Sequence, residues 1–377
     1  MRVQLKRSLY PLAALLLFSI CACSSSVYSD EIDTFDKTYV DPDSLTMAYG
    51  DFHTPLQSGY IHSGFSTISS FADGTKELSK PQPINLEFPA GESATYLQIS
   101  TDSAFTNAET ITTLGKKSYD FYNPYLSTTY YWRIAKKKES FTDAKVYTFE
   151  TTSDAPRNIN LAGVTNVRDL GGYSSKLGGT VRQGLYYRGG ALTGGSDTPS
   201  LKITANGLTT LTKTMGVKTE IDLRMTEEAN GNPENGHMND SVIPEVSYHS
   251  LPINWDTKDM ITDCKDTMCQ VFKIYANKDN YPVYVHCSIG TDRTGCVSYV
   301  MGALLGIKNE DLYHDYLFSN FGNIGSSRNS ITVRETYQND LKAYNKPTLA
   351  ECAESYLIDC GLTQNEVNSI RDIMIEK

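Results

Sequence analysis

The chain has 377 residues, 40% of them hydrophobic and 21% charged, which is the composition of a folded protein with room for two domains. Its formal net charge of −10 argues against the broad basic face on which nucleic-acid binding depends, but leaves room for a local basic pocket that takes an anionic substrate. After the first segment, no stretch approaches the ~20 apolar residues that a membrane-spanning helix needs.

The first segment has the pattern of a signal peptide. Basic residues precede a short apolar core that runs from Leu9 to Ile20. The residues that follow resemble the lipobox of bacterial lipoproteins, with the small Ala22 directly before Cys23. We expect residues 1–22 to be removed and Cys23 to carry lipid, so that the protein is exported and anchored on the cell surface or a periplasm-facing membrane. Signal cleavage without lipidation is the alternative.

Residues 23–78 are rich in Ser, Asp, Tyr and Gly and show no sustained hydrophobic period. This composition predicts a tether that lifts the following domains off the membrane. Because the segment is neither strongly charged nor rich in proline, packing of part of it stays open.

Residues 79–152 have the pattern of short β-strands separated by turn residues. Alternation over 93–100 and 129–135, and a closing strand at 146–150, predict a small all-β sandwich. The stretch around Trp132 and the end of the segment resemble fibronectin type III domains of extracellular enzymes. We expect Trp132 to anchor the core, with carbohydrate stacking as the alternative.

Residues 153–156 form a hinge, and the pattern then changes to alternating strands and helices. A helix over 201–215 is followed by Gly216, where it stops. Further strands are expected over 217–223, 246–253 and 282–286, and helices over 271–276, 294–305, 312–318, 350–357 and 365–374. This order predicts an α/β domain over residues 157–377, with a central, largely parallel sheet flanked by helices.

The chemistry lies where the strand over 282–286 delivers Cys287, followed by a short loop, Arg293 and a helix. Backbone N–H groups in such a loop form a nest for an anion, and the helix dipole adds positive charge. That field favours a thiolate at Cys287, and Arg293 can hold two phosphate oxygens. The expected phosphate-binding loop comprises Ser288, Ile289, Gly290, Thr291 and Thr294.

Residues 286–295 resemble the loop H-C-x-x-G-K-D-R-T-G of a bacterial tyrosine phosphatase family related to dual-specificity and phosphoinositide phosphatases. Four further stretches match this family in order, at 166–173, 185–192, 221–228 and 315–320. The resemblance covers residues 157–377 and implies hydrolysis through a phosphocysteine, with neither metal nor cofactor. Thr291 stands where the family usually has lysine, which puts a preference for multiply phosphorylated substrates in doubt.

Two carboxylates compete for the role of general acid. Asp292 lies in the loop and is favoured by the resemblance, whereas Asp256 follows a strand and lies well before Cys287, as the acid does in other tyrosine phosphatases. His286 is expected to orient the loop by hydrogen bonding. No histidine or cysteine spacing indicates a metal site.

Other polar residues of these motifs are candidates for supporting roles. Arg168 and Asp169 either approach the pocket or form a structural ion pair, and Arg188 is open in the same way. Asp222 and Arg224 end a strand at the edge where α/β sites gather, although a structural role is favoured for both.

The sequence thus favours a protein-tyrosine or dual-specificity phosphatase acting on a phosphorylated protein. A phosphoinositide or inositol-phosphate phosphatase is the alternative. A non-catalytic surface binding or adhesion protein is the alternative from another class, and a sulfurtransferase or arsenate reductase fits the motifs less well. Cys264 with Cys269, and Cys352 with Cys360, are close enough in sequence to pair, but their connectivity stays open.

Overall fold

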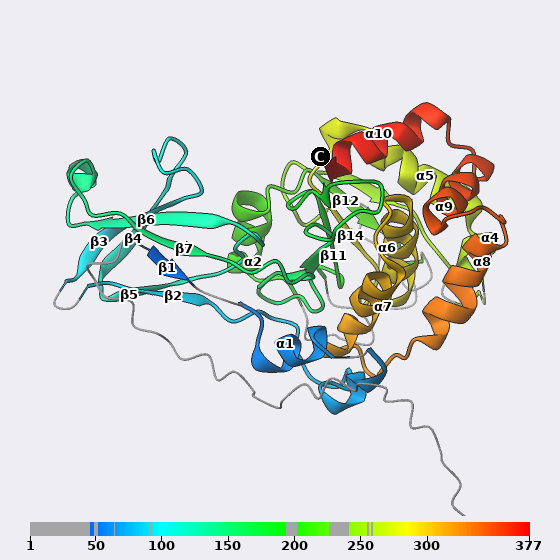
Figure 1. Cartoon of the computed structure of the whole chain (residues 1–377), viewed down its shortest axis with the longest axis horizontal. Helices are drawn as coiled ribbons and strands as arrows, with labels where there is room; N and C mark the ends of the chain where they lie inside the picture. The colour runs from blue at the N-terminus through cyan, green and yellow to red at the C-terminus, as the bar shows by residue number, and fades with distance from the viewer. Residues whose placement is uncertain are drawn as a thin grey trace, which may run out of the picture. The chain divides into compact units, whose positions relative to one another are not determined.

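The computed structural model describes residues 46–48, 52–63, 65–89, 92–193, 202–225, 241–254, 256–257 and 259–377 (Figure 1). The predicted signal peptide and Cys23 lie outside these residues. None of the helices within the described ranges is long and apolar enough to cross a membrane.

The first half of the described chain is built from β-strands. The strands are β1 Thr46–Ala48, β2 Ile84–Glu87, β3 Ala94–Ser100, β4 Glu109–Lys116, β5 Ser118–Phe121, β6 Thr129–Ala135 and β7 Tyr147–Glu150. They form a five-stranded sheet of order β1-β7-β6-β3-β4 and a two-stranded sheet of β2 and β5. Trp132 is fully buried between them and stacks on Tyr147 at 4.6 Å, so it anchors the core and has no face left for a carbohydrate.

Residues 52–78, which we assigned to the tether, contain ordered structure. Helix α1 covers Pro55–Ile61 and begins with a capping box in which Thr54 and Gln57 satisfy each other's backbone N–H groups. A short 3₁₀ helix, η1, follows at Phe65–Ser70. Tyr60 of α1 is buried, with its ring 5.7 Å from that of Phe321 in the second half of the chain. This part of the segment therefore packs against the α/β domain.

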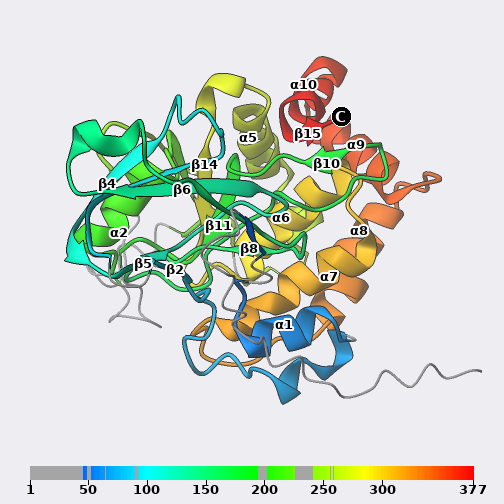
Figure 2. The ribbon, with the colours of Figure 1, turned by 60° about the vertical axis from the view of Figure 1, so that its left-hand side comes forward.

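The second half is an α/β domain, as predicted, with helices packed around a central sheet (Figure 2). The sheet is mixed and six-stranded, of order β13-β12-β14-β11-β9-β8. The strands are β8 Arg157–Asn158, β9 Arg168–Asp169, β11 Tyr186–Gly189, β12 Thr219–Asp222, β13 Ser247–Ser250 and β14 Val283–His286. The four strands from β13 to β11 are parallel, whereas β9 and β8 pair antiparallel at one edge. A separate pair joins β10 Thr180–Val181 to β15 Ile375–Glu376. The sheet is parallel only at its centre and on one side.

Helices cover both faces of this sheet. They are α2 Ala205–Thr209, continued by η3 Thr210–Thr214, then α4 Met260–Asp263, α5 Lys265–Tyr275, η4 Lys278–Asn280, α6 Asp292–Leu304, α7 Asn309–Leu317, η5 Phe318–Phe321, η6 Thr332–Tyr337, α8 Gln338–Lys342, α9 Leu349–Asp359 and α10 Gln364–Met374. Alternate strand residues reach opposite faces, because side chains in a strand alternate. Tyr284 joins the cluster that contains Leu211, while Val283 and Val285 join the cluster around α6.

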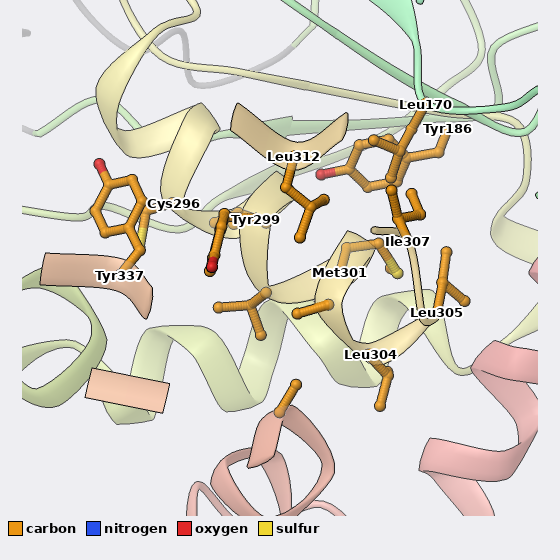
Figure 3. Packing of buried hydrophobic residues seen from close by; sticks show 14 of the residues in the cluster. Leu170, Tyr186, Cys296, Tyr299, Met301, Leu304, Leu305, Ile307, Leu312 and Tyr337 are labelled. Carbon is orange, nitrogen blue, oxygen red and sulfur yellow. The ribbon is translucent and has the colours of Figure 1, made fainter. Parts of the chain in front are cut away.

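Helix α6 forms the centre of the larger core. Every residue from Arg293 to Leu304 is buried, which is typical of a helix enclosed on all sides. Figure 3 shows Met301 and Leu304 of this helix among side chains that include Leu312 of α7. The six cysteines of the described residues are free thiols, so neither pairing that the spacing allows is present there. Because α6 is enclosed by the core, it holds the loop that precedes it, residues 287–291, in a fixed position.

Candidate active site

The phosphate-loop sequence lies at the carboxyl end of the central strand. β14 ends at His286, Cys287 follows directly, and α6 begins at Asp292. Gly290 has a φ of +72°, and a Cβ there would lie 2.2 Å from a backbone carbon of Gly189. Only glycine allows the loop to curl this closely against the neighbouring strand.

The Cys287 thiol is 2% exposed and its pKa lies below the usual value. Burial by itself raises this pKa, but the Arg293 guanidinium and the hydroxyl and backbone N–H of Thr294 lower it more. The buried Thr294 hydroxyl makes no other hydrogen bond among the described residues, and its effect is to stabilise the Cys287 thiolate. The site thus favours a thiolate, which is the nucleophilic form of cysteine.

Side chains from outside the loop hold its carbonyl groups. Arg188 Nη2 donates to the Gly290 carbonyl at 2.9 Å, and Asn166 Nδ2 donates to the Ile289 carbonyl at 3.0 Å. With these oxygens tied to the protein, successive N–H groups of the loop are left to face an anion. Asn166 also reaches the Thr291 hydroxyl at 3.2 Å. The fully buried Thr291 therefore faces the protein and contributes no charge to the pocket.

A buried carboxylate connects the arginines behind the loop. Asp315 accepts from Arg168 Nε at 2.7 Å and from Arg188 Nη1 at 2.5 Å, and all three side chains are at most 5% exposed. Burial raises the pKa of Asp315, but the two guanidinium groups hold it below its usual value overall. Arg168 and Arg188 thus support the loop from behind through Asp315.

Asp169 does not pair with its neighbour Arg168. It accepts from Arg157 Nη1 at 2.7 Å and from the backbone of Gly171 at 2.9 Å, and it is fully buried. These contacts hold Arg157, at the start of the α/β domain, against the strand that carries Asp169, so the role of Asp169 is structural.

His286, Asp222 and Arg224 form a second buried network on the other side of the loop. Asp222 lies opposite His286 in the register of β12 and β14, and it is paired with Arg224 at 2.7 Å. Burial raises the pKa of Asp222, but His286 and Arg224 lower it more, to about 2. His286 Nε2 lies 2.9 Å from Glu220 and its Nδ1 lies 3.1 Å from the Cys287 carbonyl. Burial lowers the pKa of His286, but the two carboxylates raise it overall.

The two candidate acids have different surroundings. Asp292 is one-third exposed, accepts from Tyr316 Oη at 2.8 Å, and pairs with Arg328 at 3.1 Å through Oδ1 and 3.0 Å through Oδ2. Its charge also acts on Cys287. Asp256 is exposed, and its backbone N–H bonds to Asn254. The geometry therefore favours Asp292.

Several residues of this site were not singled out from the sequence. Asn166, Asp315 and Tyr316 lie within the stretches at 166–173 and 315–320, so the motif match could have found them. Glu220 and Arg328 carried no such signal. Among the described residues, no group of three or more His, Cys, Asp or Glu side chains is placed to hold a metal ion.

A family model described as the tyrosine phosphatase family matches residues 159–376, more than half of the chain. The chain belongs to this family. Within the tyrosine phosphatase family, a relative from Cupriavidus necator that is named a putative tyrosine-protein phosphatase is 27% identical over 180 residues. The match covers 42% of this chain and 61% of the relative, so the chain spans about three fifths of the length of that relative.

Two solved structures are also similar to this tyrosine phosphatase family member. One is a cysteine-to-serine variant of TpbA of P. aeruginosa in complex with pTyr, at 15% identity over 47% of this chain and 87% of that chain, with a TM-score of 0.30. The other is the catalytic domain of the PP-IP phosphatase SIW14 of S. cerevisiae with citrate, at 15% identity over 42% and 87%, with a TM-score of 0.28. At TM-scores this low, neither structure bears on the activity of this chain.

Proposed function

We propose that the chain is a phosphomonoester hydrolase that acts through a phosphocysteine, as a protein-tyrosine or dual-specificity phosphatase. The observation that carries this proposal is the buried Cys287, whose pKa is lowered by Arg293 and Thr294 at the start of a buried helix. Family membership over residues 159–376 supports it independently.

The reaction has two steps. The Cys287 thiolate attacks phosphorus, an S–P bond forms, and the P–O bond to the leaving group breaks as Asp292 donates a proton to the leaving oxygen. Water then attacks the phosphocysteine, Asp292 takes a proton from it, and the S–P bond breaks to release phosphate. Loop N–H groups and Arg293 hold the equatorial phosphate oxygens, over which the negative charge of the transition state is distributed.

The residues around the loop act by positioning. Arg188 and Asn166 fix its carbonyl groups on the side away from the anion, and Arg168 holds Asn166 and Asp315 in turn. His286 connects the end of β14 to Glu220 and lies beside Asp222. None of these groups needs to exchange a proton with the substrate.

The test is phosphate release by the full chain with reductant and EDTA, using p-nitrophenyl phosphate, a phosphotyrosine peptide, phosphoinositides and phytate. Cys287→Ser should abolish turnover of all of them. Asp292→Asn should reduce turnover most for poor leaving groups, whereas Asp256→Asn should leave it unchanged. Preference for the peptide supports the protein phosphatase, and preference for phytate or phosphoinositides supports the inositol-phosphate alternative. Binding of phosphoesters without turnover would overturn the enzyme and favour a surface binding protein.

The same proposal places the enzyme outside the cytoplasm, as a lipoprotein modified at Cys23, with a fibronectin type III-like β-sandwich over 79–152. The apolar segment before Cys23 and the two sheets with a shared core support these parts. Metabolic labelling with a clickable fatty acid should mark the full chain and not Cys23→Ser. Equal labelling of both proteins would refute lipidation at this position.

A further inference from the structure

We propose that Arg328 binds a second phosphate group of the substrate, next to the phosphate that the Cys287 loop holds. This inference rests on the proposed function and adds a specificity-determining residue to the same site. It applies to substrates that carry two phosphates close together.

Arg328 is held in place by the turn between η5 and η6. The buried Asn320 accepts from the Arg328 backbone N–H at 2.7 Å and donates to the Arg328 carbonyl at 3.1 Å. The guanidinium Nη1 donates to the carbonyl and the hydroxyl of Ser326, both at 2.9 Å. Because backbone and side chain are both anchored, little freedom is lost when a ligand binds.

The guanidinium lies beside the Asp292 carboxylate, where the phosphate loop ends and α6 begins. It pairs with Asp292, the residue directly before Arg293, and its side chain is 24% exposed. Burial lowers the pKa of Arg328, but Asp292 raises it more, and the Cys287 thiolate contributes in the same direction. Arg328 is therefore within electrostatic range of the position that the scissile phosphate occupies.

The phosphate loop has few positive charges of its own, so a neighbouring cation adds substantially to the charge that faces a substrate. Thr291 is neutral and turned into the protein, so Arg293 is the only cation within residues 287–294. The pair of Arg328 with Asp292 is partly exposed, and such pairs contribute little net stability because water competes with them. A phosphate can replace the carboxylate, since a guanidinium holds two phosphate oxygens in the same fork.

The test measures binding in a Cys287→Ser, Asp292→Asn background, in which neither turnover nor an unpaired Asp292 carboxylate affects the result. Calorimetry with inositol hexakisphosphate should show affinity about tenfold or more weaker in Arg328→Gln, the loss expected for one hydrogen-bonded charge. Inorganic phosphate should bind within about twofold of the parent. Arg328→Lys should recover part of the affinity. Arg334→Gln removes an exposed charge from the adjacent η6 and should change neither affinity.

A second arm separates the sources of the second phosphate. Peptides with one or two adjacent phosphotyrosines are compared in the same way, and loss of affinity for the doubly phosphorylated peptide alone would assign the site to protein substrates. If Arg328→Gln weakens inorganic phosphate as much as the larger ligands, if Arg334→Gln has the same effect, or if neither ligand binds the parent, the inference is overturned. Arg328-dependent binding by a wild-type chain that turns over no substrate would refute the proposed function and leave the inference standing.

Discussion

The replacement Asp315→Asn tests how the phosphate loop is supported. The side chain keeps its size, but the charge between Arg168 and Arg188 is lost, and both guanidinium groups are at most 1% exposed. Removing one partner of a buried ion pair costs about 3–5 kcal/mol, because the remaining charge is left uncompensated. For a domain of this size, each kcal/mol lowers the melting temperature by about 2–4 °C. We therefore expect a decrease of about 6–20 °C.

The measurement is thermal and urea unfolding at pH 7, with phosphate release recorded on the same samples. Glu310→Gln is the matched control, since it removes an exposed carboxylate from the first turn of the same helix. That control should change stability by at most about 1 kcal/mol. A similarly small effect of Asp315→Asn would refute the view that this network holds the loop.

The stability difference between wild type and Asp315→Asn should also depend on pH. The folded-state pKa of Asp315 is lower than its ordinary value, so its contribution to stability is complete above about pH 4, the unfolded value. The contribution is lost as the pH falls through the lower, folded value. The gap in unfolding free energy between wild type and Asp315→Asn should be constant from about pH 5 to 8 and shrink below about pH 4. A gap that widens in acid would contradict the assignment.

Three further outcomes follow from the geometry. Thr294→Val should raise the pKa of Cys287, so the rate of iodoacetamide alkylation at about pH 6 should fall severalfold while the rate at high pH is unchanged. Gly290→Ala should abolish turnover, because its Cβ would lie 2.2 Å from a backbone atom, whereas Gly325→Ala, also at positive φ but in open space, should keep most of it. Trp132→Ala should destabilise the β-strand region by about 3–5 kcal/mol in calorimetry, and retention of its full melting temperature would contradict a core role.

The sequence was sufficient for features that are set by neighbouring residues. The phosphate loop is a short stretch of sequence. An apolar strand leads into Cys287, Gly290 and Arg293 follow within six residues, and a long apolar helix comes next, so this order alone predicts a phosphate loop at a helix start. The alternation of strands and helices predicted the α/β domain for the same reason. The structure shows β14 and α6 within two residues of the expected bounds.

Other assignments failed or stayed open because they depend on how elements pack. The tether was expected to extend to residue 78, with packing of part of it left open, and α1 buries Tyr60 against Phe321, a contact that no local pattern shows. The sheet was expected to be largely parallel, but β9 and β8 add an antiparallel edge. Such short strands carry too few residues to give a periodic signal.

The local sequence determined which residues form the loop, but only the tertiary structure decided what surrounds it. Arg168 and Asp169 are adjacent, and their opposite charges suggest a pair, yet successive residues of a strand point to opposite faces. Arg168 therefore meets Asp315, which is 147 residues away, and Asp169 meets Arg157. Arg328 reaches Asp292, 36 residues earlier in the chain, from an irregular turn. Contacts between distant segments are set by the packing of helices on the sheet, which no spacing within the sequence encodes.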